Sequence, residues 1–483
     1  MSLLGILCGL ALLIWLAYRG WSVLLLAPVA AMVAAAFAGA PLLAHWTQTF
    51  MPNAASFIAK FFPIFLLGAV FGKLMDDSGS ASAIARFMTG HLGARRAILA
   101  VVLAGALMTY GGVSLFVVIF VLVPMAEALF RAADIPRRLM PAAIGLGTMT
   151  FTMSALPGTP AVQNAIPMPF FGTTAFAAPG LGLIASAAML CFGLWWLAGA
   201  EARARRRRQG FGPGAGTRDR LAEDSLLRAR ATTAQTFDPA EIRHGKHSDS
   251  EPSVGVAVLP LIVVIVVNLA MSLLILPRLD FGFLARPEWG STSLSDVMGV
   301  WSVAIGLAAA IAALVILNHS RLPALRESMD AGANASVLPI FSVASLVGFG
   351  AVVAALPAFA LVRDWVLGIG GGPLVSLALA TNVLAALTGS ASGGMTIALG
   401  ALGETYLRLA AEQGIHPALL HRVAVIGSGT LDALPHNGAV VTLLAVCGTT
   451  HRESYSDIIM TVIVGPILAL MAVIALGSVF GSF

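Results

Sequence analysis

Two ionisable residues, Asp432 and His436, stand inside an apolar stretch of this 483-residue chain, with Pro435 between them. Ionisable groups in apolar segments cost free energy and usually serve function. A carboxyl group in apolar surroundings and an imidazole can each exchange a proton near neutral pH. The pattern predicts that Asp432 carries a proton with the assistance of His436. The alternatives are that Asp432 caps a helix or pairs with Arg422, and that His436 is a packed neutral imidazole.

Four breaks interrupt the apolar runs: two are glycine-rich, at 110–112 and 389–394, and two contain proline, at 156–160 and 434–438. Proline frees backbone groups, and freed amides and helix N-termini can hold a carboxylate. The hydroxyls and amides near the breaks, Gln163 among them, suit a small hydroxylated anion, although such residues also mediate helix packing. The predicted substrate-binding residues are Gly111, Gly112, Ser114, Ser154, Gly158, Thr159, Asn164, Thr388, Gly389, Ser390, Ser392, His436 and Asn437.

The composition identifies the elements that must position these residues. The chain is 58% apolar and 11% charged, with a mean hydropathy of +0.91. Apolar runs of about 20 residues recur along its length, which predicts an all-α polytopic membrane protein and excludes a soluble fold and a β-barrel. The three cysteines lie far apart, so we expect no disulfide, metal or other cofactor.

One segment, 201–253, breaks the apolar pattern with eleven basic and eight acidic residues. We expect a disordered linker there. Its arginines at 203–208 directly follow the apolar run 176–198, and the positive-inside rule places that end in the cytoplasm. Because the basic residues mark membrane orientation, they do not indicate nucleic-acid binding.

The linker separates two halves that resemble each other. Three matches recur in order at separations of 276 to 278 residues, and an odd number of crossings before the linker would invert the second half. We therefore expect inverted repeats over 1–200 and 254–483. The matches are 62–65 with 338–341, Glu127 and Arg131 with Glu404 and Arg408, and 154–157 with 432–435.

Within each repeat, the stretch with a glycine-rich break has legs too short to cross a bilayer comfortably, so we expect re-entrant hairpins rather than full crossings. The predicted elements are scaffold helices within 1–75, hairpin 97–130, broken helix 138–170 and helix 176–198, then scaffold helices within 254–355, hairpin 374–410, broken helix 418–450 and helix 457–480. Each Glu–Arg match is predicted to form an intrahelical ion pair. Asp76 and Asp77 are expected in solvated or capping roles.

Several of these motifs resemble the gluconate:proton symporter family of the ion transporter superfamily. They are the run from Gly111 through Ile135-Pro136 to Gly145, the tip at 388–392, and the sequence at 426–429. The resemblance implies a permease of the bacterial inner membrane, not an enzyme. It also implies proton symport and a homodimer in which a transport domain moves as an elevator against a scaffold.

The chain departs from the gluconate members of that family at 156–160 and 432–437. Polar groups are missing from the first of these stretches, so a smaller acid such as 3-hydroxybutyrate fits better than gluconate. The alternative is a sodium-coupled transporter of di- or tricarboxylates, such as citrate, from the same superfamily.

Overall fold

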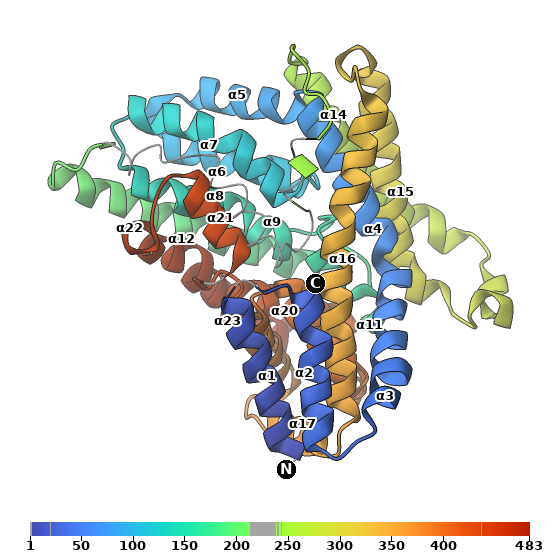
Figure 1. Cartoon of the computed structure of the whole chain (residues 1–483). Coiled ribbons are helices and arrows are strands. Elements are labelled where there is room, and N and C mark those ends of the chain that lie inside the picture. Colours follow the sequence, from blue (N-terminus) through green and yellow to red (C-terminus); the bar gives the residue numbers. More distant parts are fainter. Residues whose placement is uncertain (1, 20, 213–237, 239–240, 243, 436) are drawn as a thin grey trace.

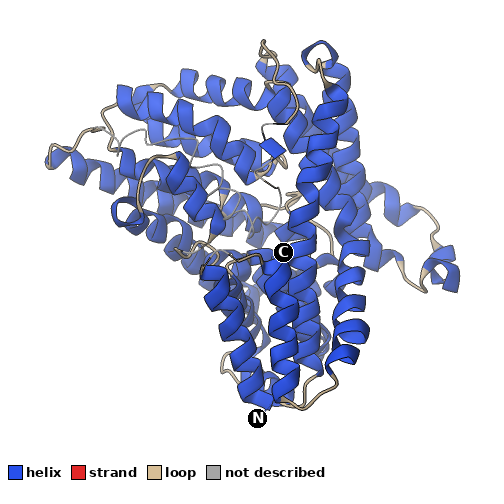
Figure 2. Ribbon diagram, in the orientation of Figure 1, coloured by secondary structure: helices blue, strands red, loops and turns tan. Residues whose placement is uncertain are grey.

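The computed structural model describes 2–19, 21–212, 238, 241–242, 244–435 and 437–483. Every regular element in these ranges is helical, and Figure 2 shows helices joined by short loops. In a bilayer the backbone must satisfy its own hydrogen bonds, and a helix does so within one segment. The predicted all-α membrane fold is confirmed.

Within the described ranges, seven helices are long and apolar enough to cross a membrane, or eight if a pair bent by 99°, Ser80–Leu92 and Ala94–Tyr110, is one span. The chain is therefore a multi-pass membrane protein. The seven are Leu42–Asp77, Leu115–Ala132, Pro179–Arg206, Val254–Arg278, Leu294–Leu317, Leu325–Ala355 and His451–Phe480.

One group of helices runs upright in Figure 1, with α4 and α16 packed along each other. A Cβ on Gly332 of α16 would lie 2.7 Å from the Cα of Val70 on α4, so this small residue lets the two backbones approach closely. The upright helices are α1 (Ser2–Tyr18), α2 (Val23–Phe37), α4 (Met51–Asp77), α14 (Val254–Ala270), α15 (Leu294–Leu317) and α16 (Leu325–Ala355).

The remaining helices carry the breaks, and α5 to α8 lie across the upright group in Figure 1. In the first half they are α5 (Ser80–Leu92), α6 (Ala97–Tyr110), α7 (Leu115–Ala132), α8 (Met140–Thr148), α9 (Phe151–Ser154), α10 (Val162–Ala165), α11 (Met168–Phe171) and α12 (Pro179–Arg206). In the second half they are α17 (Phe359–Leu367), α18 (Gly372–Thr388), α19 (Ala391–Glu412), α20 (Pro417–Thr430), α21 (Gly438–Val446), α22 (His451–Ile458) and α23 (Gly465–Phe480).

The helix order repeats with nearly the offset of the sequence matches. Helices α6, α7, α8 and α10 begin at 97, 115, 140 and 162, and α18, α19, α20 and α21 begin at 372, 391, 417 and 438, a separation of 275 to 277 residues. The repeat includes the short helices α5 and α17, which the apolar pattern did not predict. The inverted orientation of the two repeats stays a prediction.

The range 201–253 differs from expectation where it is described. Helix α12 continues through Arg206, and the end of the range folds back onto α4, where Lys73 donates to the carbonyl of Ile242 at 2.8 Å. Asp76 and Asp77 were expected in solvated or capping roles, and the solvated role is wrong, because both are buried. His247 of this returning segment lies 4.0 Å from Asp76 and 3.2 Å from Asp77. Asp77 instead pairs with Lys73 at 2.8 Å. Residues 213–237 lie outside the described ranges.

Candidate functional site

All four breaks overlap the predicted positions, but the second glycine-rich break is shorter than predicted, because 391–394 belong to α19. Helices α6 and α7 are separated at 111–114, and α18 and α19 at 389–390. Gly112 has φ +97° and Gly389 φ +63°, left-handed conformations that glycine adopts without a steric penalty. The proline breaks lie between α9 and α10 and between α20 and α21.

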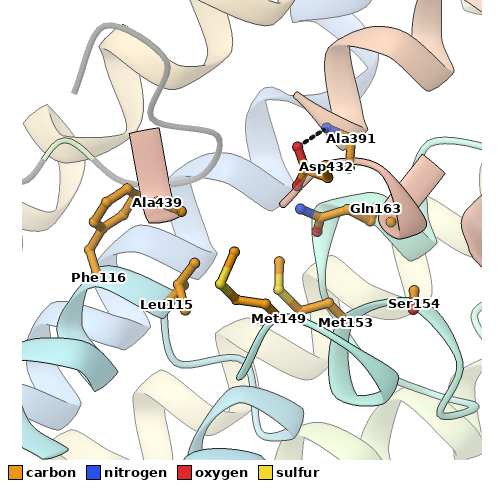
Figure 3. A pocket seen from close by; sticks show the side chains of 10 residues that line it. Leu115, Phe116, Met149, Met153, Ser154, Gln163, Ala391, Asp432 and Ala439 are labelled. Carbon is orange, nitrogen blue, oxygen red and sulfur yellow. Dashed lines mark hydrogen bonds between the residues drawn. The ribbon is translucent and has the colours of Figure 1, made fainter. Parts of the chain in front are cut away.

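A first cavity joins the two proline breaks to the second hairpin tip. Its polar side chains are Ser154, Gln163 and Asp432, and the Gln163 amide extends toward the space beside Asp432 (Figure 3). Its larger apolar side chains come from α7, from α9 and from the segment between α8 and α9. The lining residues are Leu115, Phe116, Met149, Met153, Ser154, Gln163, Ala391, Gly429, Asp432 and Ala439.

Asp432 connects the second proline break to the second hairpin tip. Its Oδ1 accepts hydrogen bonds from the backbone N–H of Ala391 at 2.8 Å and from Asn437 Nδ2 at 2.9 Å (Figure 3 shows the first). Asn437 Nδ2 also donates to the carbonyl of Gly389 at 3.0 Å, while its Oδ1 accepts from Ala439 N at 2.7 Å and caps α21. The partner predicted for Asp432, His436, lies outside the described residues.

The hydroxyls of the second tip hold the tip itself. Ser390 Oγ accepts from Gly393 N at 3.0 Å as the N-cap of α19, and lies 3.3 Å from Ser392 Oγ. Thr388 Oγ1 donates to the carbonyl of Leu384 at 2.8 Å. None of these three residues lines the first cavity or the second cavity described next. Their contacts therefore favour a role in holding the conformation of the tip over a role in binding substrate.

A second cavity adjoins the first and lies between α4, the first hairpin tip and the first proline break. Gln163, Leu115 and Met153 line both cavities, and Gly112, Ser114 and Thr109 line the second. The hydroxyls of Ser114 and Thr109 are buried and make no hydrogen bond within the described chain. Two buried hydroxyls that face a cavity without a partner are suited to bind a polar ligand.

Four other first-half candidates line neither cavity: Gly111, Gly158, Thr159 and Asn164. A Cβ on Gly111 would lie 2.3 Å from Leu261 Cδ2, so this glycine allows close contact with α14. Asn164 Nδ2 donates to the carbonyls of Thr159 at 3.1 Å and Ala175 at 3.0 Å.

Gly158 and Ser154, at the first proline break, also donate hydrogen bonds to backbone carbonyls. Gly158 has φ +82°, and its N–H donates to the Ala175 carbonyl at 2.9 Å. Ser154 lines the first cavity, but its Oγ donates to the Thr150 carbonyl at 3.0 Å. These contacts favour positioning roles for Gly158, Thr159 and Asn164.

Arg422 does not pair with Asp432, so that alternative is wrong. Its guanidinium donates to the carbonyls of Ala177, at 2.6 Å from Nη2, and of Ser154, at 3.3 Å from Nη1. The sequence pattern suggests Arg422 only as a partner of Asp432 and gives no prediction for Thr109. The signal for Arg422 was present, because it is an ionisable residue in an apolar segment, as Asp432 is.

The predicted ion pairs differ between the halves. Glu127 and Arg131 pair at 2.8 Å, as predicted, and Arg137 joins them. Glu404 and Arg408 are both described but form no ion pair within the described chain.

A group of three metal-type ligands, Asp76, Asp77 and His247, lies at the C-terminal end of α4, with ligand atoms within 4.8 Å of one another. Because Lys73 already neutralises Asp77, we assign no metal there.

Comparison with known proteins agrees with this architecture. The family model described as GntP family permease matches residues 1–172. A transporter of Bacillus subtilis, YxjC, whose function is uncharacterised, is 41% identical over the whole of both chains. The structure of MtrF from Neisseria gonorrhoeae, which belongs to a class of antimetabolite efflux pumps, is similar with a TM-score of 0.53 over 91% of this chain and 84% of that one, at 15% identity.

The MtrF likeness concerns the fold alone, whereas the match to YxjC extends over the full length and establishes the family. The chain is therefore a transporter, not an enzyme, and it belongs to the GntP family of permeases.

Proposed function

We propose that this permease carries a small hydroxy-carboxylate across the bacterial inner membrane in symport with a proton. The observation that supports the proposal most is the pair of buried, unpartnered hydroxyls of Thr109 and Ser114 at the first hairpin tip. A substrate with a hydroxyl and a carboxylate would satisfy both. The membership of the GntP permease family agrees with an organic-acid substrate.

The lining of the first cavity supports a short acid. Apolar side chains, among them Phe116, Met149 and Met153, outnumber the polar ones. A polyhydroxylated acid such as gluconate would leave hydroxyls against these apolar groups without partners, which costs free energy. The proposed substrate is therefore 3-hydroxybutyrate or a similar acid.

Asp432 is the proposed proton carrier, with His436 assisting. Asp432 lies on the wall of the first cavity and is held between the second hairpin tip and the second proline break. Protonation of Asp432 would change its contacts with both elements, and this would couple proton binding to their arrangement. Re-entrant hairpins, inverted repeats, a homodimer, an elevator movement and a cytoplasmic 201–253 linker complete the proposal.

Transport by the purified protein in liposomes tests this function. Labelled 3-hydroxybutyrate, gluconate and citrate are offered with and without an imposed pH gradient, in sodium-free buffer and then with sodium. Accumulation of the short hydroxy acid driven by the pH gradient alone is expected. Accumulation that requires sodium, or that favours citrate, would replace the proposal with the sodium-coupled alternative.

A further inference from the structure

Arg422 is the only arginine that is fully buried among the described residues. It belongs to α20 in the second half, yet every hydrogen bond of its guanidinium goes to the first half. Nε and Nη2 donate to the Ala177 carbonyl at 3.1 and 2.6 Å, and Nη1 donates to the Ser154 carbonyl at 3.3 Å and lies 3.5 Å from Asn164 Oδ1.

The neighbouring His421 adds no second charge. Asn164 Nδ2 donates to two carbonyls, which fixes Asn164 Oδ1 as the acceptor, so His421 Nε2, at 3.1 Å from Oδ1, carries a hydrogen. His421 Nδ1 lies 2.7 Å from Thr173 Oγ1, a hydroxyl whose hydrogen a neutral imidazole can accept. These contacts satisfy a neutral ring, and the adjacent Arg422 guanidinium disfavours a second charge, so Arg422 is taken as the single cation of the cluster.

The charge of Arg422 has no carboxylate partner within the described chain, because all its contacts are with carbonyl and amide oxygens. These dipoles solvate the guanidinium but leave its net charge in place. A buried charge without a counterion is costly, and such a group is expected to have a function.

The position of the Arg422 charge beside the first cavity indicates what the charge does. Arg422 binds the carbonyl of Ser154, and Ser154 lines the first cavity, so the cation lies directly behind the cavity wall. None of the described residues that line this cavity is basic. The described part of the cavity thus has one buried positive charge behind Ser154, and the carboxyl group of Asp432 in its lining.

We propose that Arg422 is a positioning residue that clamps the first proline break and gives the cavity the positive potential that selects a monocarboxylate anion. This inference rests on the proposed function and specifies its substrate class. A second carboxylate on the substrate would find no second cation among the described lining residues, which disfavours dicarboxylates.

Substitution of Asn164 tests the charge without removing the arginine. Asn164→Asp places a carboxylate beside the guanidinium and removes the two hydrogen bonds that Asn164 Nδ2 donates to the carbonyls of Thr159 and Ala175. Asn164→Leu removes the same two hydrogen bonds without adding a charge and is therefore the control. If the positive potential selects the substrate, Asn164→Asp raises the half-saturation concentration for the labelled monocarboxylate by about tenfold relative to Asn164→Leu. Equal values for the two variants would overturn the proposal.

A second measurement uses the primary amide of the same acid as a competitor. The wild-type protein is expected to prefer the acid over its neutral amide, Arg422→Lys to keep much of that preference, and Arg422→Gln to lose it. A distorted site would weaken both competitors alike and leave the ratio unchanged. A wild-type protein that binds the amide as well as the acid would overturn the proposal even if the variants failed to fold.

The proposed function and the role of Arg422 fail in different measurements. If the wild-type protein takes up no carboxylate, the proposed function itself is wrong. If it takes up the acid, but the half-saturation concentrations of the two Asn164 variants are equal or the acid-to-amide ratio does not respond to the Arg422 variants, only the role of Arg422 is wrong.

Discussion

Among the described residues, the proline break of the second half is held by hydrogen bonds from its own half, whereas that of the first half is also held by residues of the second half. In the second half, Asn437 caps α21 and reaches Asp432 within the same loop. In the first half, α10 has no side-chain cap, and Arg422 of α20 and Asn268 of α14 bind the loop carbonyls instead.

This difference shows how a duplicated backbone acquires two roles. Ser154 and Asp432 are repeat counterparts on one cavity, yet only Asp432 can titrate. The cation that faces this cavity lies behind Ser154 and comes from the other half. The acid and the buried positive charge thus lie at one cavity whose lining comes from both halves.

Removal of the acid is expected to have the largest effect. Asp432→Asn leaves an oxygen to accept from Ala391 N but cannot carry a proton, so uphill uptake driven by a pH gradient should be abolished. Exchange of labelled for unlabelled substrate needs no net proton movement and should remain in part. Counterflow and pH-driven uptake in liposomes measure the two activities.

Ser154→Ala is the matched control for that variant, because it alters the counterpart on the same cavity without touching a titrating group. It should retain uphill uptake. Persistent accumulation by Asp432→Asn would transfer the proton-carrying role to His436 as the next candidate.

Hairpin packing provides the next comparison. In the second hairpin, a Cβ on Gly394 would lie 2.2 Å from the backbone N of Ala385, so the two legs touch at this glycine. Gly394→Ala should force the legs apart, cost about 1–3 kcal/mol of stability and reduce transport about tenfold or more.

Gly400→Ala is the control on the same helix, since nothing lies within 4 Å of the added Cβ. It should leave transport unchanged and stabilise α19 slightly through the higher helix propensity of alanine. Thermal unfolding in detergent and uptake in liposomes compare the variants. Equal losses of melting temperature and of uptake in Gly394→Ala and Gly400→Ala would contradict the tight contact between the two legs at Gly394.

The sequence predicts the parts of this site that depend on backbone breaks. Gly112 and Gly389 adopt left-handed conformations where the glycine-rich breaks were predicted, because few other residues tolerate them. The acid Asp432 was found by the rarity of charge in apolar segments.

The contacts between the halves could not be predicted in the same way. The alternative in which Arg422 pairs with Asp432, ten residues along the chain, is wrong, because Arg422 binds carbonyls 245 and 268 residues away. Carbonyl acceptors occur at every position, so the sequence does not mark which ones a guanidinium reaches. Burial of Asp77 by the segment after 240 was missed for a similar reason.

Loss of the Asn437 cap on α21 is expected to have a smaller effect. The helix after the first proline break, α10, has no such side-chain cap. Asn437→Ala removes the N-cap of α21 and the hydrogen bonds to Asp432 and Gly389, which should cost about 1–2 kcal/mol of stability. Ala161→Ser is the reciprocal change, because Ala161 is the uncapped N-cap position of α10. It should not lower the melting temperature, and a loss equal to that of Asn437→Ala would contradict the assigned difference between the breaks.

The smallest expected effect concerns the ion pairs at the ends of the hairpins. Glu127, 32% exposed, binds Arg131, which is 66% exposed, and Arg137, which is 18% exposed, so solvent screens the first pair strongly and the second in part. Glu127→Gln should therefore cost less than about 1 kcal/mol, and added salt should reduce the difference from the wild type.

Its counterpart Glu404 forms no ion pair with Arg408 in the described chain, so Glu404→Gln should leave the melting temperature unchanged at any salt concentration. Equal, salt-sensitive losses in both variants would mean that the two hairpin ends are paired alike, and the asymmetry between the halves would then be confined to the proline breaks.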